Sequence, residues 1–362
     1  MGYRYIGSKD KLSQFLINEI RMQCPQASSV IDLMAGTGLF SLALRKQGFR
    51  VLASDVMTYS YHHLVVNLLM NSAPKFDGLR GILGEYCNYE NVINYLNELP
   101  PVSGFFTREF SPFGSPNSGC NPRMYFTGEN AEKIDAIRKT IKDWHLHGMI
   151  TAKEHSLLIH DLIMATNDIA NIAGTYGHFL SHFVKRSMDN IELKPFVFDE
   201  DNNIIGHEIR RGYAENIARE LKADVCYIDP PYIKRQYAAN YHILETIARE
   251  DEPEAVGVSG LRPWRDQYSD FCSKVKIRNA FDTIIRNIKC DNIFISYSED
   301  GLLSLSELMD FLSKYGKIQL RKIKYKRFRS NNSNKGLDLT EYLLSLQKKG
   351  LTRKTLCLPK DH

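Results

Sequence analysis

The sequence predicts an α/β fold built around a parallel β-sheet. Three observations support this prediction: a strand–turn–helix–strand unit at residues 28–55, a further short apolar strand at residues 225–228, and a mainly helical pattern between them. Strands that alternate with helices favour parallel pairing, because a right-handed helical crossover brings the second strand back beside the first. At 362 residues, the chain can form one large domain with an insertion, or two domains.

The first unit begins with SSVIDLMAGTG at residues 28–38, a short apolar run that leads into small residues and two glycines. LFSLALRKQG at residues 39–48 predicts a helix, because its apolar residues share one face, basic residues fill its last turn and a glycine ends it. FRVLASD at residues 49–55 then predicts a second buried strand. Together they form a βαβ unit.

The turn between this strand and helix predicts a ligand site. Gly36 and Gly38 allow the backbone to approach a ligand closely and direct helix N–H groups toward it, and Asp55 at the tip of the next strand is placed to bind ribose hydroxyls. Phe40 and Ser41 stand where a dinucleotide-binding turn continues toward a third glycine. This argues against NAD and favours a smaller adenosine-containing ligand.

Asp32 precedes the glycine turn. A carboxylate at this position suits a ligand that carries a cationic group nearby, such as the amino group of S-adenosylmethionine.

The stretch at residues 75–205 differs in character. It opens with segments rich in Pro, Gly, Ser and Asn and then becomes helical. One predicted helix carries an apolar stripe at a spacing of three to four residues. The stripe consists of Ile134, Ile137, Ile141 and Trp144. TAKE at residues 151–154 predicts a capping box at the start of a second apolar helix.

GTYGHFLSHFVKRS at residues 174–187 interleaves Tyr, His, Lys and Arg, and we interpret it as a polar loop and helix that face DNA. His178 and His182 have a spacing that metal sites also use, but no acidic or Cys partner stands near them in the sequence, so we predict no metal site.

The stretch KADVCYIDPPY is the most informative in the chain. The strand at residues 225–228 must stop after Asp229, because consecutive prolines donate no ladder hydrogen bonds and force an extended backbone. Most Pro-Pro pairs mark no more than a rigid strand exit. In an open α/β sheet, however, ligands bind outside the carboxyl ends of the strands, which places Asp229 beside the glycine turn and Asp55.

The chemistry of this stretch suits a planar base with an exocyclic amino group. The Asp229 carboxylate and the Pro230 carbonyl provide two rigidly held acceptors, and Tyr232 offers a flat face for stacking. An amino group on an aromatic base needs such a pair of acceptors.

A basic run lies near the C-terminus. Between residues 311 and 337 there are nine Lys or Arg and no acidic residue, and in KIQLRKIKYKRFRS the basic residues alternate with apolar ones. Alternation of period two predicts a strand with one basic face. Two interpretations stay open from charge alone: an edge strand that lysines protect from pairing, or a surface that contacts phosphates.

Composition favours a cytoplasmic protein. No apolar stretch approaches the ~20 residues that a membrane helix needs, and the start of the chain has no signal-peptide core. Seven cysteines without a CxxC pair favour reduced thiols over a disulfide framework.

Four segments together resemble the alpha group of DNA adenine-N6 methyltransferases, the Dam-like class that includes many restriction-modification enzymes. They are RYIGSK (4–9), DLMAGTG (32–38) with Asp55, RRGYAENI (210–217) and DPPY (229–232), in that group's order. Ala35 stands at a position that is commonly Gly in the group. The resemblance covers nearly the whole chain.

The resemblance implies a Rossmann-like S-adenosylmethionine-dependent methyltransferase fold with a mixed seven-stranded sheet. It further implies a discontinuous catalytic domain at residues 1–74 and 206–362, and a mainly helical target-recognition domain inserted at residues 75–205. The expected host is a bacterium, an archaeon or a phage.

The resemblance also implies roles for individual residues. For the cofactor S-adenosylmethionine, these are Tyr5, Lys9, Asp32, Ala35, Gly36, Gly38, Asp55, Tyr213 and Asp229. For the flipped target base they are Asp229, Pro230 and Tyr232. For the DNA strand they are Lys234, Arg235, Gln236, Tyr237, Arg321, Lys324, Lys326, Arg327 and Arg329. No metal is required.

The implied activity is methyl transfer to N6 of an adenine flipped out of duplex DNA, as the modification enzyme of a restriction-modification system. Cytosine N4 is an alternative target, although such enzymes more often carry Ser before the two prolines. RNA and a protein glutamine are remoter targets. A DNA-binding protein with a vestigial cofactor fold and an NAD oxidoreductase are rivals from other classes. A cognate endonuclease could share the site, and we expect a monomer or a weak dimer; the recognition sequence cannot be read from the chain.

Overall fold

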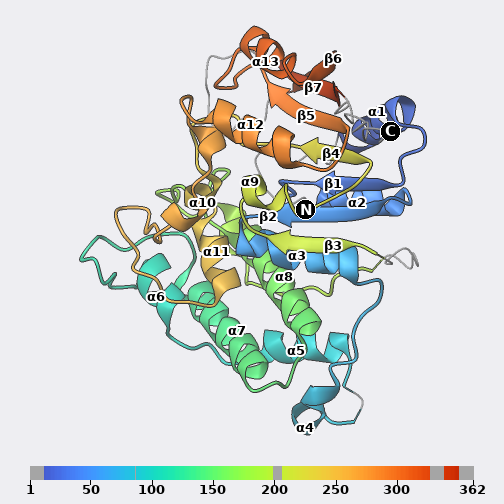
Figure 1. The fold of residues 1–362 in the computed structure, drawn as a ribbon. Coiled ribbons are helices and arrows are strands. Elements are labelled where there is room, and N and C mark those ends of the chain that lie inside the picture. Colours follow the sequence, from blue (N-terminus) through green and yellow to red (C-terminus); the bar gives the residue numbers. More distant parts are fainter. Residues whose placement is uncertain (1–11, 86, 199–205, 327–337, 350–362) are drawn as a thin grey trace, which may run out of the picture.

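The computed structural model describes residues 12–85, 87–198, 206–326 and 338–349. Its centre is one seven-stranded sheet with the order β3-β2-β1-β4-β5-β7-β6 (Figure 1). The strands are β1 (Ser29–Asp32), β2 (Arg50–Asp55), β3 (Glu208–Arg211), β4 (Val225–Ile228), β5 (Asn292–Ser298), β6 (Gly316–Lys326) and β7 (Asp338–Lys348). All neighbours pair in parallel except β7, which is antiparallel to both β5 and β6. The predicted mixed seven-stranded sheet is therefore confirmed.

Helices cover both faces of the sheet, because successive side chains along each strand point to opposite sides. Val30 and Val51 pack in one core with α1 (Ser13–Gln23), α2 (Leu39–Lys46) and part of α3 (Thr58–Leu69). Ile31 and Leu52 pack in the other core. The helices of this second face are α9 (Ala214–Ile217), α12 (Ile277–Asn287) and α13 (Leu305–Leu312).

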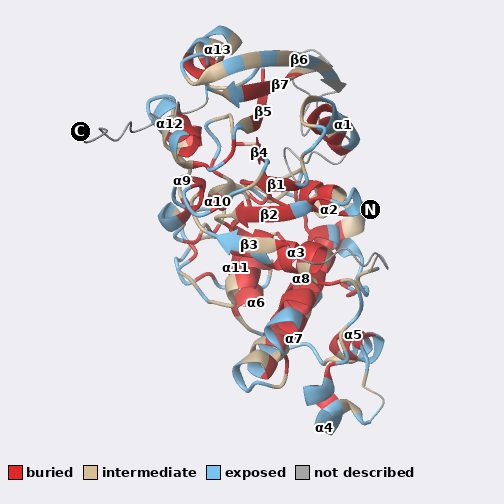
Figure 2. Cartoon of the chain, turned by 45° about the vertical axis from the view of Figure 1, so that its right-hand side comes forward, coloured by how far each residue is buried: buried red, intermediate tan, exposed pale blue. Residues whose placement is uncertain are grey.

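A third, helical layer continues from α3 away from the sheet, below it in Figure 1. It consists of α4 (Arg80–Leu83), α5 (Tyr89–Glu98), α6 (Phe105–Phe110), α7 (Gly128–Leu146), α8 (Ala152–Ile169), α10 (Tyr237–Asn240) and α11 (His242–Arg249). Val65 and Val66 of α3 belong to its core, together with residues of α11, so elements from both sides of the 75–205 insertion share one core with it. Figure 2 shows α3 and α8 as largely buried.

Local signals in the sequence correspond well with these helices. The predicted stripe of α7 is buried along its length, and the side chains of Thr151 and Glu154 form the expected capping box at the start of α8. Short 3-10 helices at Asp77–Leu79, Lys185–Met188, Arg265–Gln267 and Asp270–Cys272 complete the elements.

The segment at residues 174–187 is not the predicted combination of loop and regular helix. It is irregular up to a single 3-10 turn at Lys185–Met188. Asn171 explains why: its side chain donates to the carbonyl of Leu180 and accepts from the N–H of Val184, which holds the backbone in a loop. His178 and His182 therefore do not share a helix face.

Among the described residues, none of the helices has the length and apolar character that crossing a membrane would require.

Candidate active site at the carboxyl ends of the central strands

One cavity opens where the strand order reverses, between β1 and β4, at the carboxyl ends of the parallel strands. This switch point is the usual ligand site of open α/β sheets. Six of the residues predicted to bind the cofactor or the target base line the cavity together: Asp32, Ala35, Gly36, Asp55, Tyr213 and Asp229. They come from segments up to about two hundred residues apart in the sequence.

The glycine turn forms the floor of this cavity. Gly36 and Gly38 have φ angles of 55° and 75°, in the left-handed region that favours glycine. A side chain at Gly38 would place its Cβ 2.9 Å from Nδ2 of Asn67, so space as well as conformation selects glycine there. Gly38 itself precedes α2 and lies just behind the cavity wall.

Asp55 holds the turn against the end of β2. Its Oδ2 accepts from the backbone N–H of Gly36 at 2.8 Å, and its Oδ1 accepts from the N–H of Met57 at 2.9 Å. Burial raises the pKa of Asp55 to about 6, although these backbone donors oppose the rise. The Asp55 carboxylate thus shapes the turn and also faces the cavity.

Asp32 is the most buried acid of the cavity, with 1% of its surface exposed. The Ser41 hydroxyl donates to its Oδ2 at 2.6 Å. The pKa of Asp32 is raised to about 7, chiefly by burial and in smaller part by the charges of Asp229 and Asp55, while the Ser41 hydrogen bond opposes the rise. Together with Glu215, these three carboxyl groups line one cavity, which favours a cationic ligand.

Asp229 directly follows β4, as predicted, and lines the cavity together with Pro231. Pro230 is buried behind them. Tyr232 lies beside the cavity and not in its wall: its hydroxyl donates to Oε1 of Glu341 at 3.3 Å, and its ring meets Tyr297 edge to face at 5.9 Å. These contacts fix the rigid exit that the two prolines begin.

A strap at residues 264–269 closes another side of the cavity, which Gln267, Tyr268 and Ser269 line. The Gln236 side chain binds the backbone of Ser269 at two points: Oε1 accepts from its N–H at 2.8 Å and Nε2 donates to its carbonyl at 3.0 Å. The Tyr213 hydroxyl donates to the carbonyl of Asp266 at 2.7 Å. The strap is therefore bonded to the segment that follows Asp229.

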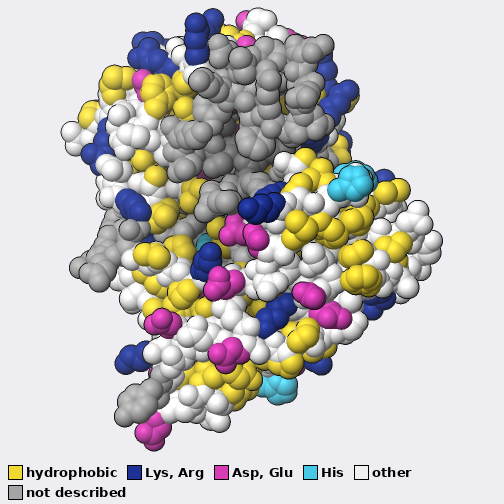
Figure 3. Space-filling view, turned by 180° about the vertical axis from the view of Figure 1, so that it is seen from behind, with side chains coloured by type: hydrophobic (Ala, Val, Ile, Leu, Met, Phe, Trp, Pro, Cys, Tyr) yellow, Lys and Arg dark blue, Asp and Glu magenta, His cyan; other side chains and the backbone are white. Residues whose placement is uncertain are grey.

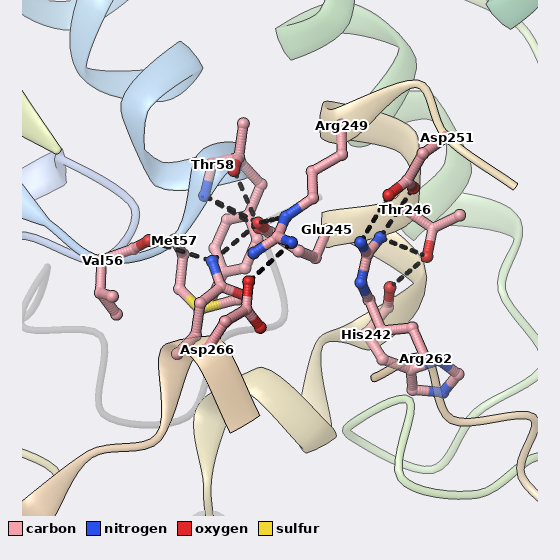
Figure 4. Close-up of polar contacts among 12 residues, drawn as sticks. Val56, Met57, Thr58, His242, Glu245, Thr246, Arg249, Asp251, Arg262 and Asp266 are labelled. Atoms are coloured by element: carbon pink, nitrogen blue, oxygen red, sulfur yellow. Dashed lines mark hydrogen bonds and ion pairs between the residues drawn. The ribbon is translucent and has the colours of Figure 1, made fainter. Parts of the chain in front are cut away.

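Glu245 of α11 anchors the other side of the strap (Figure 4). It is fully buried and accepts from the N–H of Thr58 at 2.9 Å, from Nε2 of Gln267 at 2.8 Å and from Nε of Arg249 at 2.7 Å. Gln267 also donates to the carbonyl of Val56 at 3.0 Å. This network ties the strap to the start of α3, next to Asp55.

Sequence reasoning did not identify Glu245 and Gln267, and it assigned Gln236 to a different role. Each is an ordinary polar residue in its local sequence, and only the tertiary fold brings the three to the strap. The signal in the sequence is the position of Glu245 inside an otherwise apolar helix face, HILETIA, where burial of a charge requires partners.

The predicted DNA-contacting residues differ in their surroundings. Lys234 and Arg235 are exposed, whereas Gln236 and Tyr237 line the cavity. Arg321 on β6 pairs with Glu19 of α1 at 3.2 Å. Lys324 is exposed on the same strand, and the side chain of Lys326 is not described. Tyr5, Lys9, Arg327 and Arg329 lie outside the described residues.

Comparison with known proteins identifies the family to which the chain is similar. Residues 5–311 match the D12 class N6 adenine-specific DNA methyltransferase family. The chain is 35% identical to the type II methyltransferase M.FokI of Planomicrobium okeanokoites and 32% identical to the modification methylase StsI of Streptococcus sanguinis, over 95% and 98% of its length. It spans about half of those two relatives, 52% and 53% of their lengths.

A third relative matches end to end. The chain is 32% identical to the type II methyltransferase M.NlaIII of Neisseria lactamica, over 95% of this chain and 99% of that protein.

Proposed function

Because the chain belongs to the D12 class N6 adenine-specific DNA methyltransferase family, we propose that it transfers the methyl group of S-adenosylmethionine to N6 of an adenine in double-stranded DNA. Its biological role would be the modification half of a restriction-modification system, since its relatives bear the names of modification methylases. One observation carries the proposal: Asp229 shares a cavity with the glycine turn, Asp32 and Asp55.

The residues of this cavity fit S-adenosylmethionine in charge and shape. The cofactor carries a sulfonium and an ammonium group, and four acidic residues line the cavity: Asp32, Asp55, Glu215 and Asp229. Asp32 and the turn at residues 35–38 would hold the methionine part, Asp55 the ribose, and Tyr213 the adenine edge. When bound, the cofactor supplies an electrophilic methyl group on sulfur.

The protein's own part in the chemistry follows from Asp229. Adenine N6 is a weak nucleophile, because its lone pair is delocalised into the ring. Hydrogen bonds from the amino group to the Asp229 carboxylate and the Pro230 carbonyl stabilise the more pyramidal nitrogen that forms as the bond to carbon develops. Asp229 and Pro230 would hold the amino nitrogen in line with the methyl group that the cofactor supplies, and the methylated nitrogen would lose one proton to solvent. Positioning supplies much of the rate.

The target base must leave the duplex, since its amino group is paired there. A flipped base stacks on an aromatic ring with a gain of about 1–3 kcal/mol, which offsets part of the cost of unstacking. We assign this role to Tyr232, whose ring is held beside the cavity by Glu341 and Tyr297.

We further propose the alpha-group, Dam-like subclass. In this chain the cofactor turn precedes the long insertion at residues 75–205, and the insertion precedes DPPY. The insertion would form most of the target-recognition domain, and residues 1–74 and 206–362 would form the catalytic domain.

Lys234, Arg235 and Lys324 are the proposed phosphate contacts among the described residues. Lys234 and Arg235 are exposed five and six residues after Asp229. Because β6 runs in the same direction as β4, the end of β6 that carries Lys324 lies at the same edge of the sheet as the cavity. We propose that the protein acts as a monomer or weak dimer in the cytoplasm, beside an endonuclease of the same specificity.

The test is transfer of a tritiated methyl group from S-adenosylmethionine to DNA, followed by digestion to nucleosides. We expect the label in N6-methyl-2′-deoxyadenosine. Label in N4-methylcytosine would move the target to cytosine, and DNA binding without transfer would support a vestigial cofactor fold.

A further inference from the structure

Resting on the proposed function, we propose that the target sequence is read by one surface built from three segments: residues 111–122, 174–181 and 255–261. We call this the reading surface. Its third segment lies beyond the catalytic DPPY, outside the 75–205 insertion. Lys, Arg, Asp and Glu are absent from all three segments, although they make up 25% of the chain.

Arg123 links the first and third segments through hydrogen bonds. Its side chain is fully buried and donates to the carbonyls of Ala255, Gly257 and Val258 at 3.2, 3.0 and 3.2 Å. Another guanidinium nitrogen binds Oε2 of Glu109 at 2.9 Å, so the buried charge is neutralised. A buried arginine that donates to three loop carbonyls gives this loop a fixed shape.

Tyr125 and Ser259 join the second segment to the third. The Tyr125 hydroxyl donates to the carbonyl of Tyr176 at 2.7 Å and lies 3.1 Å from that of Ser259. The Ser259 hydroxyl donates to the carbonyl of Gly177 at 2.7 Å. Gly260 adopts a φ of +66°, and a Cβ there would lie 2.8 Å from Nε of Arg123. The three segments are thus one preorganised unit.

The reading surface adjoins the candidate active site. The N–H of Tyr176 donates to the carbonyl of Asn240 at 2.8 Å, and Asn240 ends α10, whose first residue, Tyr237, lines the cavity. A duplex whose base enters the cavity therefore passes this surface.

The chemistry of the exposed groups selects base edges over phosphates. A surface without Lys or Arg lacks the cations that supply most of the affinity for phosphates, whereas Asn, Ser and Thr side chains and apolar groups can still read base edges, as Arg and Lys do elsewhere. The exposed side chains include Asn117 and Asn121, and Phe113 and Val258 are 84% and 66% exposed. The loops beside α6 and α10 project to the left in Figure 1, which is the right-hand edge of the molecule in Figure 3. Figure 3 shows mainly hydrophobic and uncharged side chains along that edge.

Sequencing of modified bases tests this inference. DNA of high sequence diversity is methylated by the wild-type protein and by Asn117→Ala, Asn121→Ala and Val258→Ala, and the base preference at each position of the site is measured. We expect Val258→Ala and at least one of the two asparagine variants to relax the preference at one or two positions by about 5- to 100-fold, the discrimination carried by one base contact. Cofactor affinity should stay within about threefold.

Matched controls lie away from the surface. Asn18→Ala changes an exposed asparagine of α1, and Leu146→Ala changes a side chain that is 69% exposed at the far end of α7. Both should keep the wild-type site. Absence of methyl transfer by the wild type would refute the proposed function itself. Normal methyl transfer with an unchanged target sequence in all three variants would refute only the reading surface. If the same variants bound a protein differently from the wild type, the surface would belong to a protein partner.

Discussion

Asp32 shows how burial can tune a single carboxyl group. It is nearly inaccessible and faces two other carboxylates, so the pKa of its side chain rises to about 7. Below that pH the group is protonated in the cofactor-free protein and does not attract a cationic amino group. Its ionisation is therefore linked to ligand affinity.

We expect the affinity for S-adenosylmethionine to fall as the pH drops through 7. The dissociation constant at pH 6 should be about tenfold higher than at pH 8, since a ligand that binds the ionised form must first remove one proton. Isothermal titration calorimetry across this range measures the effect. Asp32→Asn should bind more weakly at pH 8 and should lose most of the pH dependence. An equally steep dependence in the variant would assign the titration to another group.

At the scale of elements, the strap at residues 264–269 couples two parts of the site. Gln236 bonds it to the segment after Asp229, and Gln267 and Glu245 bond it to the start of α3. The strap thus spans the cavity from the segment after Asp229, where we propose that the target base binds, to the start of α3 next to Asp55, where we propose that the cofactor binds.

We expect Gln236→Ala to raise the dissociation constant of the cofactor by about 5- to 160-fold, because two hydrogen bonds to Ser269 are lost and each contributes about 0.5–1.5 kcal/mol. The change in kcat should be smaller than the change in KM for the cofactor. Gln319→Ala, at an exposed position of β6, is the control. Steady-state kinetics with unchanged KM in the Gln236 variant would show that the strap does not position the cofactor.

Buried histidines link α3 to α8. Nδ1 of His63 and Nδ1 of His160 are 2.8 Å apart, so one ring donates and the other accepts. Burial lowers the pKa of His160 to about 4 and that of His62 to about 3, and it holds the pKa of His63 well below its ordinary value. These rings stay neutral in the folded protein at pH values where the unfolded chain binds protons.

Stability should therefore decline as the pH falls from about 6.5 toward 4. Each such histidine contributes a loss of up to about 1.4 kcal/mol in the free energy of unfolding at pH 5.5. The raised pKa values of Asp32 and Asp55 act in the opposite direction between pH 4 and 7. Urea unfolding of the wild type and of His63→Leu measures the contribution of the histidines. The free energy of unfolding of the variant should decrease less as the pH falls. Exposed His147→Leu should keep the wild-type slope.

The sequence predicts those elements whose signals are local. The strand at residues 225–228, the Thr151–Glu154 capping box and the glycine turn at residues 36–38 all occur where predicted. Contacts such as those of Arg123 with Gly257 or of Gln236 with Ser269 could not be predicted, because they depend on how distant loops pack. The irregular form of residues 174–187 depends likewise on Asn171, whose side chain competes for their backbone groups.

At the scale of the whole molecule, charge is distributed unevenly. Residues 311–337 contain nine of the 47 basic residues and no acidic one, and the strand that crosses this region forms an edge of the sheet. Both interpretations of the basic run therefore stay compatible with its position: protection of an edge, and contact with phosphates. A measurement of salt dependence separates them.

We expect the logarithm of the DNA-binding constant to fall linearly with the logarithm of the salt concentration. For Lys324→Gln the slope of this line should be less steep by about 0.9, the contribution of one phosphate contact on duplex DNA. Fluorescence anisotropy between low and physiological salt gives both slopes. Lys139→Gln, an exposed lysine of α7, should leave the slope unchanged. Equal slopes for the wild type and Lys324→Gln would limit Lys324 to edge protection.

The most direct test of the account compares methyl transfer and cofactor binding in Asp229→Ala. Because Asp229 would stabilise the reacting nitrogen, we predict that kcat for transfer to DNA falls by at least about 100-fold, while the dissociation constant for S-adenosylmethionine stays within about threefold and exposed Asp291→Ala behaves as wild type. Methyl transfer near the wild-type rate by Asp229→Ala would contradict the claim that this carboxylate joins the cofactor cavity to the target base.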